Sequence, residues 1–114
     1  MNTGYDVLLK ARKLIAEPAQ WTQKYGARNR QGYPVNCDDD DAVCWCALGA
    51  ISKCTYSLDI AEDTIAALEL TSARMFGRTV AGVNDHLGHA AILQVFDAAL
   101  AKASPTPVSP AQEG

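Results

Sequence analysis

The chain has 114 residues and a mass of 12.2 kDa, which suits one domain and is too little for two. Hydrophobic residues make up 48% and charged residues 20%, an ordinary globular composition that excludes a wholly disordered chain. The net charge of −3 argues against a basic surface that coats nucleic acid, and no apolar run reaches the roughly 18 residues of a membrane span.

The first predicted element is a helix over residues 4–17, because its apolar residues form one stripe and its basic residues face away. Pro18 should end or bend this helix, and Trp21 follows in a short further turn that stops at Gly26. Residues 26–37 are poor in helix formers, so we expect a loop or a short hairpin there.

An acidic run, Asp38–Asp41, precedes the apolar stretch AVCWCALGAISKC. Carboxylates stabilise the positive end of a helix, so the run predicts the start of a central buried helix. Gly49 in this stretch would let another helix approach closely. An EF-hand loop is excluded, because the alternating ligands and the glycine at its sixth position are missing.

Two further helices follow. Ser57 is a good N-cap and Gly77 a good C-terminal stop for one of them. Asn84 or Asp85 is the expected cap of the other helix or of a turn that precedes it. The predicted inward stripe of this last helix is Ile92, Val95, Phe96, Ala99 and Leu100. The predicted fold is therefore all-α, a compact bundle of about four helices with at most a minor hairpin. We expect one domain over residues 1–103 and a disordered, Pro/Ser-rich tail over residues 104–114.

The charge is unevenly distributed along the chain. Residues 1–37 carry a net charge of +4 and residues 38–114 a net charge of −7. The two sets can face each other or water, or one of them can attract a charged partner. The basic first third also interleaves aromatic residues, as in Trp21, Arg28 and Arg30, so binding of nucleic acid is one alternative function.

The four cysteines follow the spacing C-x6-C-x-C-x7-C, which matches no paired C-x2-C zinc pattern. We therefore expect no metal site and no cofactor, and interpret the thiols as buried and inert. No signal peptide is recognisable, which favours the cytoplasm and reduced cysteines.

A cysteine-dependent enzyme is a second alternative. Cys46 would be the nucleophile near a helix start, with His86 or His89 as its base. Asn84 or Asp85 would orient the imidazole. The usual nucleotide-binding and hydrolase motifs are absent, so buried thiols and surface histidines remain the simpler interpretation.

Several blocks of the chain resemble a family of short uncharacterised proteins, a domain-of-unknown-function family of bacteria and their phages. The resemblance covers about residues 5–102 and rests on these blocks: Trp21-Thr22-Gln23, Ala27-Arg28, Trp-Cys-Ala-x-Gly-Ala over residues 45–50, Val83-Asn84-Asp85, and Phe96-Asp97-x-Ala99. It implies no established activity, but it directs attention to Trp21, Arg28, Cys46, Gly49, Asn84 and Asp85. Members usually lack Cys44, which counts against a role for that thiol. On physical grounds, Arg28 could pair with Asp85 or with the acidic run.

Taken together, these features favour a small cytoplasmic, non-enzymatic protein that binds a protein partner. The resemblance permits a phage accessory protein or a host-directed inhibitor. The residues expected to contribute to binding are Trp21, Arg28, Arg30, Asn84 and Asp85.

Overall fold

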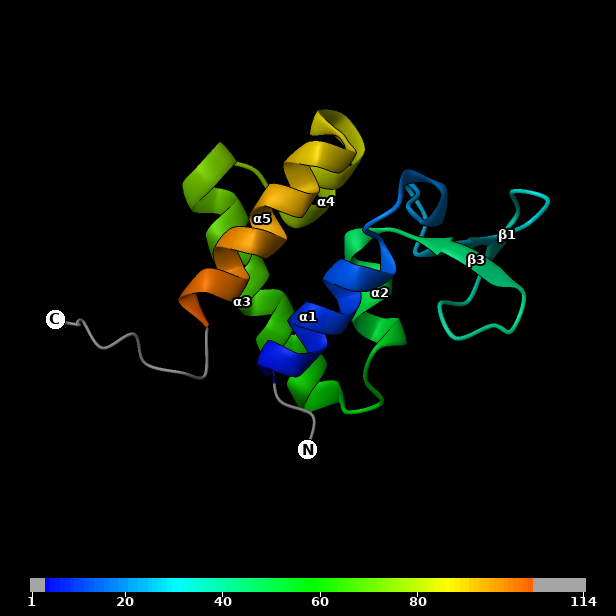
Figure 1. Cartoon of the computed structure of the whole chain (residues 1–114), viewed down its shortest axis with the longest axis horizontal. Helices are drawn as coiled ribbons and strands as arrows, with labels where there is room; N and C mark the ends of the chain where they lie inside the picture. The colour runs from blue at the N-terminus through cyan, green and yellow to red at the C-terminus, as the bar shows by residue number, and fades with distance from the viewer. Residues whose placement is uncertain (1–3, 104–114) are drawn as a thin grey trace, which may run out of the picture.

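The computed structural model describes residues 4–103, and in it helices and strands occupy separate regions (Figure 1). The tail predicted over residues 104–114 lies outside the described residues. We call the packed helices the helical body and residues 22–45, which carry the strands, the arm. The helical elements are α1 (Gly4–Leu14), α2 (Ala47–Lys53), α3 (Leu58–Phe76), α4 (Val80–Gly82) and α5 (His89–Lys102), with a 3₁₀ turn η1 (Pro18–Gln20) and a π-helical turn η2 (Val83–Leu87).

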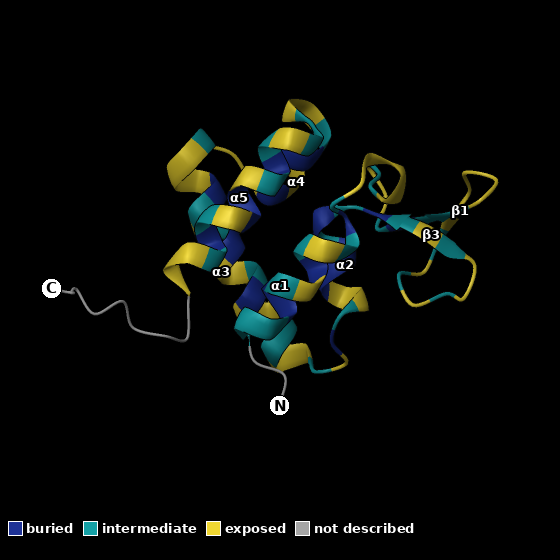
Figure 2. Ribbon diagram, in the orientation of Figure 1, coloured by how far each residue is buried: buried dark blue, intermediate teal, exposed yellow. Residues whose placement is uncertain are grey.

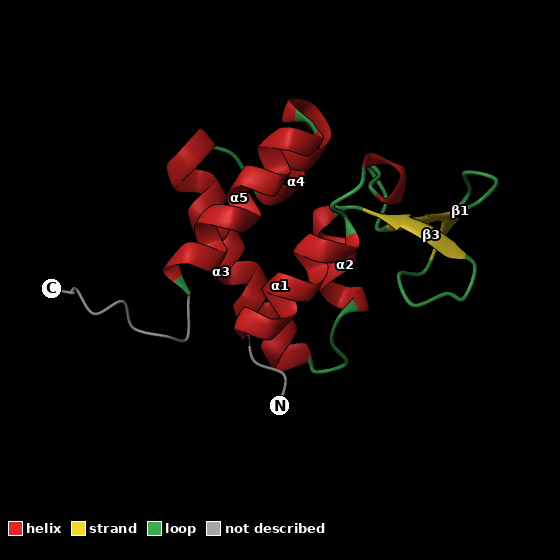
Figure 3. Cartoon of the chain, in the orientation of Figure 1, coloured by secondary structure: helices red, strands yellow, loops and turns green. Residues whose placement is uncertain are grey.

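The arm contains a three-stranded antiparallel sheet in the order β2-β1-β3. Figure 3 shows its strands β1 and β3 apart from the helices. Its strands are β1 (Ala27–Asn29), β2 (Pro34–Val35) and β3 (Ala42–Trp45). The prediction of an all-α bundle is therefore wrong, because the described chain combines helices with this sheet. The short hairpin expected in residues 26–37 does form, with Ala27 opposite Val35 in the β1–β2 pair.

The acidic run starts a strand and not a helix. Asp39 Oδ1 accepts a hydrogen bond from the Asp41 amide at 2.7 Å, and the Ala42 amide donates to the Asp39 carbonyl at 3.0 Å, so these residues form a turn. β3 follows directly, with Cys44 opposite Arg28 in β1. Pairing with β1 overrides the helical pattern of residues 42–45, and the helix begins only at Ala47.

The long helix α3 follows its predicted signals. The Ser57 hydroxyl accepts a hydrogen bond from the Ile60 amide at 3.2 Å, and Gly77 ends the helix with φ of 67°. Apolar residues recur at three- and four-residue spacing along α3, among them Leu58, Ile65 and Leu68. Leu68 is buried, whereas Leu58 at the start of the helix is 78% exposed. The apolar stripe therefore reaches beyond the body that covers its middle.

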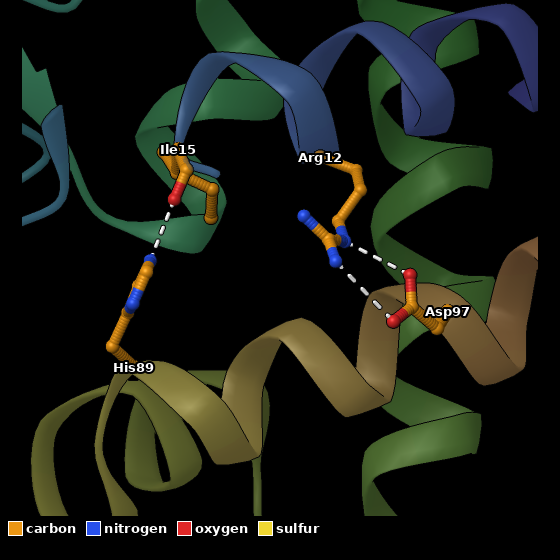
Figure 4. Close-up of polar contacts among 4 residues, drawn as sticks. All are labelled: Arg12, Ile15, His89 and Asp97. Carbon is orange, nitrogen blue, oxygen red and sulfur yellow. Dashed lines mark hydrogen bonds and ion pairs between the residues drawn. The ribbon is translucent and has the colours of Figure 1, made fainter. Parts of the chain in front are cut away.

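The hydrophobic core lies among the helices, whose inward faces are buried while most of the arm is not (Figure 2). Of the predicted inward residues of α5, Ile92, Val95, Phe96 and Ala99 are buried and Leu100 is partly buried. Two polar contacts join α1 and the residue that follows it, Ile15, to α5 (Figure 4). Arg12 Nε lies 2.9 Å from Asp97 Oδ1, and His89 Nε2 lies 2.7 Å from the carbonyl oxygen of Ile15.

Candidate functional site: a pocket between the arm and the helical body

Asn84 joins the arm to the helical body from the π-helical turn η2. Its side chain is buried, with 1% of the residue exposed. Its Oδ1 accepts from Trp21 Nε1 at 2.8 Å and from the Ala47 amide at 3.0 Å. Its Nδ2 donates to the Thr22 carbonyl at 3.0 Å and to Asp85 Oδ1 at 2.9 Å. The full hydrogen-bonding capacity of the amide is thus used.

This geometry corrects the expected capping role. Asn84 does not cap the last helix, whose N-cap is Gly88 without a side-chain hydrogen bond. Instead its Oδ1 caps the first amide of α2, at Ala47, from 37 residues away. Cys46 is the local N-cap of α2, and its Sγ accepts from the Gly49 amide at 3.3 Å. The wider π-helical turn, closed by a hydrogen bond from the Gly88 amide to the Val83 carbonyl, carries the Asn84 side chain to these partners.

Asp85 fixes the first turn of the arm. Its Oδ1 accepts from the Lys24 amide at 2.9 Å as well as from Asn84. Gln23 Nε2 donates to the carbonyls of Asn84 and Asp85 at 3.2 and 3.1 Å. Lys24 has a φ of 75°, a conformation that costs a side-chain-bearing residue about 1–2 kcal/mol. The bond from the Lys24 amide to Asp85 and the bonds from the Gln23 side chain to η2 therefore hold the backbone at Lys24 in a strained conformation.

Arg28 stabilises the arm from within. Its guanidinium donates to Thr22 Oγ1 at 2.9 Å, to the Gly32 carbonyl at 2.9 Å and to the Gln23 carbonyl at 3.3 Å. It also lies 4.7 Å from the centre of the Tyr25 ring. The expected pairing with Asp85 or the acidic run is not among the contacts of the described residues, so that prediction was wrong.

Arg30 is exposed and lies beside the acidic run. It lines a second pocket, of about 380 Å³, together with Asp40 and Asp41. One basic residue of the first third of the sequence thus lies near the acidic run on the arm.

A pocket of about 320 Å³ opens where the arm meets the body. Its apolar walls include Leu48, Val80 and Ala81 from the helices, and Tyr25 from the arm. The polar lining residues are Lys24, Cys37, Cys46, Ser52, Asn84 and Asp85. A volume of this size is at the lower end of those that receive small molecules or side chains.

The predicted close approach at Gly49 occurs, but the neighbour is not a helix. A side chain at Gly49 would collide with the backbone of Gly26 in the arm. The Cys46 amide donates to the Gly26 carbonyl at 3.1 Å beside this contact. Gly49 therefore lets the arm pack directly against the start of α2, and both glycines line the pocket.

The structure does not bring Cys46 together with a histidine. Burial raises the pKa of the Cys46 thiol above its ordinary value of 9.0, and the nearby Asp85 charge adds to the rise. His89 contacts the Ile15 carbonyl, and its ring lies 5.1 Å from that of Trp21. His86 is exposed and does not line the pocket. Within residues 4–103 the thiol thus has neither an imidazole partner nor a lowered pKa.

The sequence-predicted residues divide into two groups. Trp21, Asn84 and Asp85 meet at the junction, with Cys46 in the same pocket. Arg28 and Arg30 lie elsewhere on the arm. Lys24 and Cys37 were missed as site residues, because their place in the pocket depends on a strained turn and on the position of the arm, which leave no local sequence signal.

Two further properties concern residues 4–103 as a group. No three histidine, cysteine or acidic side chains in this range are grouped closely enough to hold a metal ion. None of the helices in it combines the length and the apolar character needed to cross a membrane.

Comparison with known proteins places the chain in a family of unknown function. That family, DUF6197, matches residues 1–102, so the chain belongs to it. The match includes the whole helical body and the arm. Curated proteins and solved structures gave no match.

Proposed function

We propose that the protein is a non-enzymatic binding domain, and that a segment of a protein partner enters the pocket between the arm and the helical body. The observation that carries this proposal is that Asn84 and Cys46, two polar residues that line the pocket, are already hydrogen-bonded within the chain. The side-chain amide of Asn84 is fully engaged within the chain, and the Cys46 Sγ accepts from the Gly49 amide. These groups build the pocket, and its largely apolar interior is left to receive a ligand.

The charge near the pocket favours a partner segment with basic residues. Asp85 is the carboxylate in the lining, and its Oδ1 is held by two hydrogen bonds. Asp38 acts electrostatically on the Cys37 thiol in the same lining and helps to raise its pKa, after burial and the Cys46 charge. Opposite charges on a partner would steer its approach to this side of the molecule.

Two observations favour this function over the alternatives. A protonated thiol without a neighbouring imidazole is poorly suited to nucleophilic catalysis. Two of the three basic residues of the arm are engaged, because Arg28 bonds within the arm and Arg30 shares a pocket lining with Asp40 and Asp41. Lys24 remains, which is little positive charge for a phosphate backbone.

The four thiols of the chain are free, which suits the reducing conditions of the cytoplasm. A cytoplasmic accessory protein of a phage, directed at a host protein, is the form of this proposal that agrees with the family resemblance.

The proposal is tested by filling the pocket. Ser52 is exposed and lines the pocket, whereas Gln94 is exposed on α5 away from it, so Ser52→Trp and Gln94→Trp are matched variants. A partner is captured from a host lysate, identified by mass spectrometry and purified, and its affinity is measured by calorimetry. We expect Ser52→Trp to abolish binding and Gln94→Trp to preserve it. A partner that binds both variants equally well would contradict use of the pocket.

Alkylation tests the competing cysteine enzyme. Because burial raises the pKa of Cys46, we expect iodoacetamide at neutral pH to label it more slowly than an exposed thiol, and the rate to rise with pH. Peptide mapping locates the label, and Cys46→Ser, which retains an N-cap oxygen, serves as the control. Fast labelling of Cys46 at neutral pH would revive the enzyme hypothesis.

A further inference from the structure

One of the two carboxylate oxygens of Asp85 accepts no hydrogen bond from the described residues. Both hydrogen bonds to its side chain, from the Lys24 amide and from Asn84 Nδ2, end on Oδ1. Oδ2 has no hydrogen bond or ion pair within residues 4–103. A carboxylate can accept about four hydrogen bonds, so Asp85 retains capacity for a cationic donor after it has anchored the arm.

The pocket around this carboxylate suits an aliphatic chain. Leu48, Val80 and Ala81 supply apolar walls, and the exposed Tyr25 ring and the Ser52 hydroxyl also line it. A long basic side chain places its methylene groups against such walls and its charge on a polar group. Lys24 is the cation in the lining, and it forms no ion pair with Asp85 in the described part of the chain.

From these features we infer that the pocket receives a lysine side chain of the partner polypeptide, with its ammonium group bound to Asp85. This inference rests on the proposed function and names the chemistry of the segment that enters. Lysine is favoured over arginine because guanidinium binds carboxylates best through two parallel hydrogen bonds. With Oδ1 already occupied, Asp85 offers one oxygen, which suits the single point charge of an ammonium group.

The test uses small probes and the complete protein. The lysine probe is Nα-acetyl-lysine methylamide, and the comparison probes carry arginine, Nε-acetyl-lysine or norleucine in its place. Norleucine retains the aliphatic chain and lacks the charge. Binding is followed by amide chemical shifts, and a probe of this size is expected to bind with a Kd in about the millimolar range.

We expect the lysine probe to shift the amides of Leu48, Ala81 and Asp85. Norleucine and Nε-acetyl-lysine should bind about tenfold more weakly, because the charged hydrogen bond is lost. Equal binding of norleucine, or the absence of pocket shifts with the lysine probe at about ten times the expected Kd, would overturn the inference.

Asp85→Asn isolates the charge. The asparagine Oδ1 can still accept from the Lys24 amide and from Asn84, so the arm should stay anchored while the lysine probe loses its advantage over norleucine. Lys24→Gln should have the opposite effect and raise the affinity for the lysine probe, because it removes a positive charge that repels the ammonium group. A lysine preference that survives Asp85→Asn in a folded protein would contradict the role of Asp85.

Failure of this inference and failure of the proposed function give different results. If the pocket binds its partner without preferring lysine, Ser52→Trp still abolishes the partner complex while Asp85→Asn leaves it intact. If the proposed function fails, the partner complex survives Ser52→Trp.

Discussion

The helical body and the arm of this protein are stabilised in different ways. Among the buried apolar residues of the described chain, Ala27 and Trp45 belong to the arm, and the others belong to the body or to Ile15 just after α1. The arm depends instead on hydrogen bonds, made by Arg28 within it and by Asn84 and Asp85 at its base. A small sheet with little area to bury needs such polar contacts to hold one position, because apolar burial is the main favourable term elsewhere.

This comparison predicts that truncation of the core has the largest effect. Phe96 is fully buried in α5, and Phe96→Ala should lower the free energy of unfolding by about 3–5 kcal/mol. Urea denaturation followed by circular dichroism measures the loss. Leu70→Ala is the control, since Leu70 is 52% exposed and its truncation should change stability by about 0.5 kcal/mol or less.

Asn84→Ala should separate the two regions. It removes four hydrogen bonds and leaves Trp21 Nε1 and the Ala47 amide without their acceptor, at a cost of about 3 kcal/mol. We expect amide hydrogen exchange to accelerate in residues 22–45 more than in α3 and α5. Uniform acceleration of exchange across both regions would show that the arm and the body unfold as one unit, which would contradict their separate stabilisation.

Arg28→Lys should loosen the arm alone. Lysine cannot reproduce the forked contacts with Thr22, Gln23 and Gly32, and the expected cost is about 1–2 kcal/mol. Hydrogen exchange of the hairpin amides is the measurement. Arg30→Lys, at an exposed position on the same arm, should leave exchange unchanged.

Lys24→Gly should have the smallest effect. Glycine relieves about 1–2 kcal/mol of strain at φ of 75° and loses about 0.5–1 kcal/mol through greater freedom of the unfolded chain. The melting temperature should therefore stay the same or rise slightly. A clear fall would mean that the Lys24 side chain contributes stabilising contacts of its own.

The sequence predicted the body better than the arm. α3 could be located because its serine cap and its terminal glycine agree with each other, and α5 because of its periodic apolar residues. Residues 42–45 were predicted to be helical because they are apolar and continue into α2 without a change in composition, but they form the strand β3. Only its partner strand decides that it is extended, and that pairing is non-local.

The candidate site could be predicted only in part. Asn84, Asp85, Trp21 and Cys46 stood out in the sequence and do meet at the junction. Their roles could not be deduced, because the cap that Asn84 provides acts on a helix 37 residues away. Lys24 could not be found at all, since its place in the pocket depends on a backbone conformation that favours glycine.

The position of Asn84 has a consequence for the order of folding. Thr22 and Asn84 are 62 residues apart, so the arm is synthesised well before the side chain that anchors it. Contacts of such long range form late, because a large loop must close before they stabilise the chain. The contact between Gly26 and Gly49 spans 23 residues and can form earlier on a nascent chain, whereas the bond from Asn84 to Thr22 must wait until η2 has been synthesised. The pocket is complete only when η2 has formed and its Asn84 has bound the arm, so a nascent chain that ends before residue 84 lacks this binding surface.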